Sequence, residues 1–97
     1  MPMYVSLMKL TDQGIQTIKD LPQRLAAGEK LIESTGGKLL AFYVVMGEWD
    51  YVAISEGPSD EAALATVLAL GSGGNIRTLT MKAFEMETVE PILEKLP

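Results

Sequence analysis

The stretch "VVMGEWDYVAI", Val44–Ile54, sets one glycine, two carboxylates and the chain's only tryptophan between two apolar runs. A glycine at the first central position is what a two-residue type II′ turn requires, so Gly47-Glu48 predicts a β-hairpin. A hairpin also fixes which residues of its two strands face each other. The predicted pairs are Val45 with Asp50, Tyr43 with Val52, and Ala41 with Ile54.

The segments on either side of the hairpin predict the order β-α-β-β-α-β-α. Thr11 and Ser59 are suited to cap helices, because their hydroxyls accept hydrogen bonds from N–H groups of a first helical turn. Pro22 divides the first helical segment, since proline is tolerated in a first turn but not in a helix interior. Strands are predicted at 3–10, 38–46, 50–56 and 75–84, and helices at 12–19, 21–34, 60–71 and from about Thr88 onward.

This order predicts a ferredoxin-like α+β domain, that is, a βαββαβ sandwich followed by a C-terminal helix. Because crossovers between parallel strands are right-handed, the expected strand order across the sheet is 4-1-3-2. A chain of 97 residues has room for one hydrophobic core, so we expect a single domain over residues 1–97.

Both faces of the predicted sheet are apolar, since successive side chains of a strand point to opposite faces. The more aliphatic face holds Val5, Leu7, Leu79 and Met81 beside the hairpin pairs, and we expect it to seat the helices. The other face is too apolar to stay open in a soluble monomer. The residues placed on that second face are Tyr4, Ser6, Met8, Leu40, Phe42, Val44, Met46, Trp49, Tyr51, Ala53, Ser55, Thr78, Thr80 and Lys82.

That uncovered face has two compatible interpretations. The first is face-to-face homodimerisation, which makes the fold a dimeric α+β barrel. The second adds a cavity between the two sheets, lined by Tyr4, Ser6, Tyr51 and Thr80, for an apolar or aromatic small molecule. The hydrophobic fraction of 47% is high for so small a chain and also favours a surface covered by another subunit.

The composition excludes several kinds of site. The chain has no cysteine and no histidine, which rules out disulfides and thiol catalysis and removes the commonest metal ligand. No metal or other cofactor is predicted. A net charge of −5 without a basic cluster disfavours nucleic acid as a partner. No apolar stretch reaches the length of a membrane span, so we expect no membrane partner and a cytoplasmic location.

The predicted topology brings the unusual residues to one rim of the sheet. Lys9, Asp50 and Arg77 are expected on neighbouring strands and on one face, as an ion-pair cluster that holds the hairpin. The alternative is an anion site formed by Arg77, Lys9 and backbone amides near the glycine-rich loop Gly71–Asn75. That loop lacks the Lys-Ser/Thr ending of a nucleotide-phosphate loop, and we expect it to end its helix in a left-handed conformation.

Three blocks of the sequence resemble the GYD-domain family of small bacterial proteins: "MYVSLMKLTDQGIQTIKDLPQRL", "FYVVMGEWDYVAISEGPSDEAA" and "LALGSGGNIRTLTMKAF". The resemblance covers nearly the whole chain and implies a dimeric α+β barrel of ferredoxin-like topology, with no assigned activity. The family commonly has a tyrosine before the hairpin's aspartate, where this chain has Trp49. An indole N–H cannot act as an acid or base at neutral pH. Asp50, Asn75, Arg77 and Thr78 stand where the family's blocks have them.

Three functions remain open at this point. The first is a non-enzymatic homodimer that binds a small molecule. The second is a cofactor-free enzyme of the oxygenase or isomerase type, in which Trp49, Tyr51 and Asn75 orient an aromatic or enolisable substrate and Asp50 is the base. The third is a structural assembly module. No catalytic residue is assigned, and the candidate ligand or rim residues are Trp49, Asp50, Asn75, Arg77, Lys9, Tyr4 and Tyr51.

Overall fold

The computed structural model describes residues 1–97 and has the predicted order of elements, with differences at two helices. The predicted helix at 12–19 is a short α-helix followed by a 3₁₀ turn, and the last helix begins at Met86 rather than near Thr88. The elements are β1 (Met3–Leu10), α1 (Asp12–Gln16), η1 (Ile18–Asp20), α2 (Leu21–Ser34), β2 (Lys38–Val44), β3 (Tyr51–Glu56), α3 (Asp60–Ser72), β4 (Ile76–Ala83) and α4 (Met86–Glu94).

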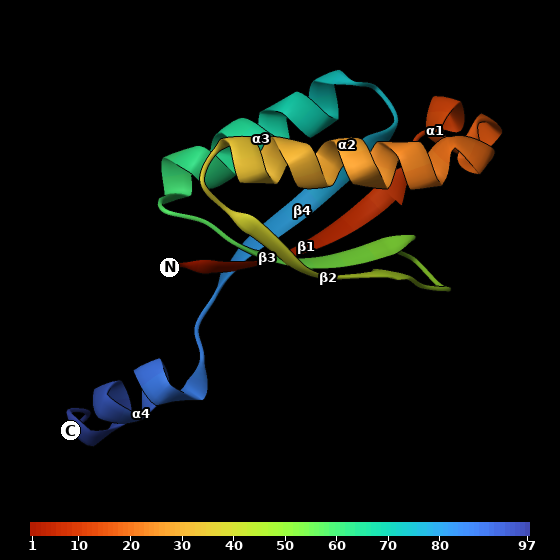
Figure 1. Ribbon diagram of the computed structural model, residues 1–97. Coiled ribbons are helices and arrows are strands. Elements are labelled where there is room, and N and C mark those ends of the chain that lie inside the picture. The colour runs from red at the N-terminus through yellow and green to blue at the C-terminus, as the bar shows by residue number, and fades with distance from the viewer.

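The four strands form one antiparallel sheet in the order β2-β3-β1-β4, which confirms the predicted order. The helices α2 and α3 lie side by side over one face of this sheet, and α4 stands away from it on the other side (Figure 1). This is the ferredoxin-like α+β arrangement that two right-handed crossovers produce.

The hairpin has the predicted register but a longer loop. Tyr43 pairs with Val52 and Ala41 with Ile54. The predicted two-residue turn is wrong, because the hydrogen bond that closes the loop runs from the Val45 N–H to the Asp50 carbonyl (2.9 Å) and leaves four residues between them. Gly47 in this loop has a φ of +118°, a conformation that residues with a side chain rarely adopt.

A bulge in β2 changes which residues point toward the helices. The register shifts between Leu39 and Ala41, so the strand carries one extra residue at Leu40. Leu39, rather than Leu40, therefore packs against the buried cluster beside Phe42, and Leu40 is 43% exposed. The prediction that Leu40 shares a face with Phe42 is wrong for this reason.

The predicted helix caps at Thr11 and Ser59 are confirmed. The Thr11 hydroxyl accepts a hydrogen bond from the Gly14 N–H, and the Ser59 hydroxyl accepts one from the Ala62 N–H. Pro22 lies in the first turn of α2, where its missing N–H leaves no helical hydrogen bond unmade. After α3 ends, Gly74 has a φ of +81°, which is the left-handed residue expected in the glycine-rich loop.

The helices cover the face of the sheet opposite to the one predicted. Tyr4, Ser6, Met8, Tyr51 and Ala53 are buried beneath α2 and α3, whereas the predicted seat of the helices is left uncovered. The reason lies in the hydroxyls. Those of Ser6 and Thr80 are 2.9 Å apart and hydrogen-bond to each other, so these two hydroxyls of the mixed face can be buried as a pair. The more aliphatic face therefore remains outside.

We call this uncovered aliphatic surface the open face. Register and alternation place on it Val5, Leu7, Ala41, Tyr43, Val52, Ile54, Leu79 and Met81. Tyr43 is 58% exposed and Leu79 is 47% exposed. Contiguous apolar surface of this kind is a common feature of interaction surfaces in proteins.

The chain is extended because α4 contributes nothing to the core. None of the residues of α4 is buried, and the helix projects beyond the sheet (Figure 1). The radius of gyration is 14.9 Å, against about 12.5 Å for a compact chain of this length. Only eight of the 97 residues are buried, so much of the chain's apolar surface has no partner within the chain.

Candidate functional site

The rim of the sheet holds most of the predicted site residues, but they do not form the predicted ion-pair cluster. Lys9 and Arg77 are direct partners across β1 and β4. The Asp50 carboxylate accepts a hydrogen bond from the Leu10 N–H (2.8 Å) and forms no ion pair with either cation. The Lys9 ammonium instead lies 5.6 Å from the centre of the Trp49 ring, within the range of a cation–π contact.

Asp50 therefore serves as a backbone organiser at this rim. Its own N–H donates to the Met8 carbonyl (2.9 Å), while its carboxylate takes the N–H of Leu10 two residues further along β1. These two bonds continue the β1–β3 pairing past the end of the ladder and fix the hairpin loop against β1. One oxygen of the Asp50 carboxylate is therefore occupied by a structural hydrogen bond to β1 rather than directed at a substrate.

Asn75 ties the start of β4 to α1 at the same rim. Its carbonyl accepts the Thr11 N–H (3.0 Å), and its side-chain oxygen accepts from the Gln13 amide (3.0 Å). Gly14 approaches so closely that a β-carbon there would stand 2.1 Å from the Asn75 carbonyl oxygen. The side-chain NH₂ of Asn75 has no hydrogen-bond partner within the chain.

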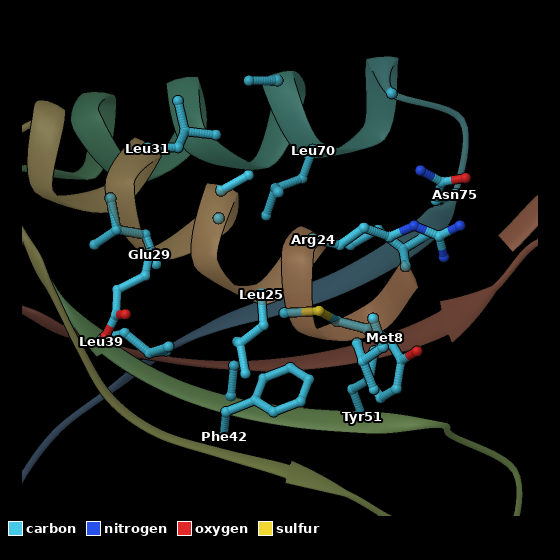
Figure 2. A pocket seen from close by; sticks show the side chains of 18 residues that line it. Met8, Arg24, Leu25, Glu29, Leu31, Leu39, Phe42, Tyr51, Leu70 and Asn75 are labelled. Carbon is cyan, nitrogen blue, oxygen red and sulfur yellow. The ribbon is translucent and has the colours of Figure 1, made fainter. Parts of the chain in front are cut away.

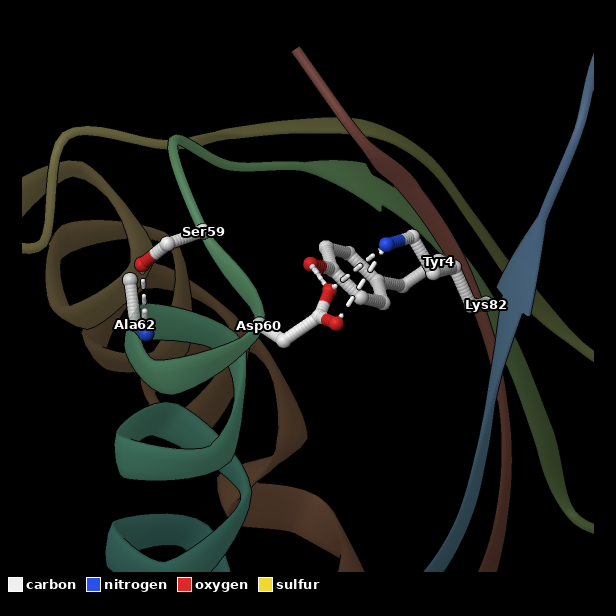
Figure 3. A network of polar contacts seen from close by, with 5 residues as sticks. All are labelled: Tyr4, Ser59, Asp60, Ala62 and Lys82. Carbon is white, nitrogen blue, oxygen red and sulfur yellow. Dashed lines mark hydrogen bonds and ion pairs between the residues drawn. The ribbon is translucent and has the colours of Figure 1, made fainter.

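Tyr4 lies at the other end of the sheet and has a different role. Its hydroxyl donates to the Asp60 carboxylate (2.6 Å), and the Lys82 ammonium lies 3.2 Å from the same carboxylate (Figure 3). Asp60 is in the first turn of α3, where the helix dipole also favours a negative charge. The network fastens the start of α3 to β1 and β4.

These contacts shift the pKa values of both acids. The hydrogen bond to Asp60 raises the pKa of Tyr4 to about 12, with burial adding to the effect. The same hydrogen bond, followed by the one from Lys82, lowers the pKa of Asp60. Tyr4 therefore stays protonated, with its hydroxyl engaged by Asp60. It lies about 17 Å along β1 from Lys9 and does not form one site with the rim residues.

A cavity of about 260 Å³ lies between α2 and the sheet, and 13 of its 18 lining residues are hydrophobic (Figure 2). The apolar wall includes Leu25, Leu39, Phe42, Leu70 and Ile76. The rings of Phe42 and Tyr51 are tilted against each other with centres 5.2 Å apart. Of the residues predicted for the site, Tyr51 and Asn75 line this cavity.

The few polar side chains of the cavity lie at its two ends. Arg24 and Asn75 lie together at one end, and Glu29 lies at the other, beside Leu39 (Figure 2). The Arg24 guanidinium donates to the carbonyls of Gly14 (3.1 Å) and Thr17 (2.9 Å) and to the Thr17 hydroxyl, so its charge is held in place by the end of α1. The buried Tyr51 hydroxyl has no hydrogen-bond partner, and burial raises the pKa of Tyr51.

Sequence reasoning missed Arg24, Gly28 and Asp60. Gly28 lies in the middle of α2 and lines the cavity, and a β-carbon there would meet only a Leu70 methyl at 3.9 Å. A glycine inside a predicted helix is the signal that could have pointed to this cavity, because glycine costs a helix about 1 kcal/mol relative to alanine. The contacts of Arg24 and Asp60 are made across elements and carry no sequence signal.

Neither a metal site nor a membrane span is evident. No group of three or more acidic, histidine or cysteine side chains is placed to hold a metal ion. None of the helices has both the length and the hydropathy that crossing a bilayer requires.

Comparison with known proteins decides the family. The model of the GYD domain matches residues 4–93. The chain is a GYD-domain protein. A curated relative of this GYD-domain protein, from Thermus thermophilus, is 31% identical over 84 residues, which cover 86% of this chain and 88% of the relative. That protein is named "Glutamine synthetase and cystathionine beta-lyase binding protein".

Solved structures agree with the fold of the GYD-domain protein. The leucine response regulatory protein LrpA of Mycobacterium tuberculosis has a TM-score of 0.65 at 21% identity over 87% of this chain. A feast or famine regulatory protein of the same organism, complexed with L-methionine, has a TM-score of 0.66 at 20% identity over 88% of this chain. The chain spans 51% of the length of each of these regulators. At such identities the likeness shows the ferredoxin-like fold alone.

Proposed function

We propose that this GYD-domain protein is a non-enzymatic binding protein that works as a homodimer, with two copies packed through their open faces. The observation that carries the proposal is the aliphatic open face, on which Tyr43 and Leu79 are about half exposed or more, in a chain with only eight buried residues. Burying apolar area contributes roughly 25 cal/mol per Å², so a second sheet on this face would supply the core that the single chain lacks.

Charge distribution favours a second copy as the occupant of the open face. Lys9 and Arg77 face each other at its rim, and neither has a carboxylate partner within the chain. Like charges directly opposite on a sheet are destabilising. The free helix α4 is acidic as well as apolar, so the helix of a partner could neutralise this pair. Its acidic residues and the glutamate before it are Glu85, Glu87, Glu90 and Glu94.

Binding rather than catalysis is supported by the relative and by the rim. The Thermus relative is named for the enzymes that it binds, and we propose a binding role for this chain too. The cofactor-free enzyme remains a prediction without support from the contacts, because Asp50 is engaged with a backbone N–H and Trp49 with Lys9. A purely structural assembly module would use the open face alone and leave the cavity under α2 without a role.

The proposed ligand is a small apolar or aromatic molecule, but its place differs from the predicted one. Tyr4, Ser6, Tyr51 and Thr80 were expected to line a cavity between two sheets, and they lie under the helices instead. We place the ligand instead in the cavity under α2. A second candidate ligand is an enzyme, by likeness to the Thermus relative, and a binding assay with purified glutamine synthetase and cystathionine β-lyase would test it.

Leu79→Asp, with Leu64→Asp as a matched control, tests the dimer. Leu79 is on the open face and 47% exposed, and Leu64 is on α3 and 56% exposed, so both changes have a similar effect on one isolated chain. A dimer carries each substitution twice. Without the two leucines, the dimer no longer buries their exposed halves, which weakens dimerisation by about 2 kcal/mol. The two carboxylates placed in an apolar contact weaken it by at least about 4 kcal/mol more.

We therefore expect Leu79→Asp to raise the dimer dissociation constant by roughly 10⁴-fold and Leu64→Asp to leave it unchanged. Light scattering coupled to size exclusion, over a dilution series, measures this directly. A wild-type protein that is monomeric at every concentration, or two variants that remain equally dimeric, would overturn the proposed pairing.

A further inference from the structure

The cavity under α2 is large enough and apolar enough to hold a small organic molecule within one chain. Its volume of about 260 Å³ exceeds the roughly 150 Å³ of an engineered cavity that binds benzene. Leu25, Phe42 and Ile76 come from three different elements and provide its apolar wall. The space therefore suits a body the size of one aromatic ring or a branched alkyl group with a short polar extension.

Gly28 indicates that this space is maintained against helix stability. It is an interior residue of α2, where glycine costs about 1 kcal/mol relative to alanine. No close approach explains it, because a β-carbon at Gly28 would meet only a Leu70 methyl at an ordinary contact distance of 3.9 Å. A larger side chain at this position would occupy the cavity.

The polar end of the cavity offers donors and a positive charge. The Arg24 guanidinium is fixed by the carbonyls of Gly14 and Thr17, and the Asn75 side-chain NH₂ is without a partner. The Tyr51 hydroxyl is buried and unpaired, and Tyr51 lines the same cavity. A buried hydroxyl without a partner is destabilising unless something else satisfies it. Glu29 lies at the opposite end (Figure 2), so it does not neutralise Arg24.

We propose that this cavity binds a small aromatic or branched aliphatic carboxylate, with the apolar body among Leu25, Phe42 and Ile76 and the carboxylate toward Arg24, Asn75 and Tyr51. The polar end offers donors and one positive charge, and an anionic acceptor complements both. The inference deepens the proposed binding role by naming the ligand class, and it does not depend on the homodimer because every lining residue comes from one chain.

Three probes of nearly equal size test the charge preference: phenylacetate, the neutral phenylacetamide and the cationic phenethylamine. Titrations followed by ¹H–¹⁵N NMR should give saturable shifts at the lining residues with phenylacetate. Phenylacetamide should bind more weakly, and phenethylamine at least tenfold more weakly than phenylacetate. Equal affinity for the anion and the cation, or the absence of shifts around the cavity, would overturn the inference.

Variants separate a ligand site from a packing defect. Tyr51→Phe keeps the ring and removes the hydroxyl, so it should weaken phenylacetate binding about 3- to 10-fold, the effect of one hydrogen bond, while the melting temperature stays equal or rises. Tyr43→Phe removes the same hydroxyl from the open face, away from the cavity, and as the matched control should leave phenylacetate affinity unchanged. A Tyr51→Phe protein that is less stable and binds phenylacetate normally would contradict the assignment.

Gly28→Leu should fill the cavity and abolish phenylacetate binding, and circular dichroism shows whether the variant is folded. Because Leu79→Asp acts on the open face, its monomer should still bind phenylacetate with wild-type affinity. Probe binding by a protein that never dimerises would reject the homodimer and keep this site, whereas a stable dimer without probe binding would reject the site alone.

Discussion

Alanine substitutions at two helical glycines should have opposite effects on stability. In Gly28→Ala the new methyl group meets a Leu70 methyl at 3.9 Å and nothing closer. The change therefore adds about 1 kcal/mol of helix propensity without strain. For a domain of this size that corresponds to a rise in melting temperature of roughly 4 to 8 °C.

In Gly14→Ala the same methyl group would lie 2.1 Å from the Asn75 carbonyl oxygen and 3.0 Å from a Leu10 methyl. Backbone has to move, and the hydrogen bond from the Thr11 N–H to that carbonyl is lost with it. We expect a loss of about 3 kcal/mol, at the upper end for overpacked sites. Thermal and urea unfolding of both variants at one protein concentration measure the two effects. If Gly28→Ala is less stable than wild type, the space beside Gly28 is not open. If Gly14→Ala is as stable as wild type, Gly14 does not lie tightly against the Asn75 carbonyl.

Three further predictions concern the polar contacts and α4. The folded-state pKa of Tyr4 is raised to about 12, so its hydrogen bond stabilises the fold fully below pH 10 and is lost as the pH rises from about 10 toward 12. Wild type should therefore lose more stability over that window than Tyr4→Phe does. Unfolding measured across alkaline pH will show this difference. Asp50→Asn keeps an acceptor for the Leu10 N–H and should cost less than about 1 kcal/mol in urea unfolding, whereas Asp50→Ala should cost about 1 to 2 kcal/mol; equal costs would mean that the hydrogen bond is not the role of Asp50. Ending the chain at Phe84 removes α4, and the remainder should stay folded by circular dichroism but dimerise more weakly in sedimentation, while unchanged dimerisation would exclude α4 from the interface.

The local features of the fold could be predicted from sequence because their causes are local. The hydroxyls of Thr11 and Ser59 cap helices within three residues of themselves, and Pro22 acts on its own turn. Strand order followed from the handedness of crossovers. The bulge at Leu40 was not predicted, since a single extra residue in an apolar strand leaves the composition of the strand unchanged.

The assignment of faces failed because both faces of the sheet are apolar. Counting aliphatic residues put the helices on the side of Leu79 and Met81. The count omitted the hydrogen bond between Ser6 and Thr80, which lowers the penalty for burying these two hydroxyls.

The candidate site was predictable only in part. Tyr51 and Asn75 line the cavity as candidates from sequence, but Asp50 was expected to pair with cations and bonds a backbone N–H instead. A backbone N–H beyond the end of a strand ladder is invisible in a sequence, whereas a nearby lysine or arginine is conspicuous.

The pairing of two open faces is tested most directly by isotope-filtered NMR on a dimer formed from one labelled and one unlabelled copy. We predict intermolecular contacts from the methyl groups of Val52, Leu79 and Met81, which lie on the open face. Intermolecular contacts confined to the outer surfaces of α2 and α3, or a protein that shows one chain's mass of 10.5 kDa at NMR concentration, would contradict it.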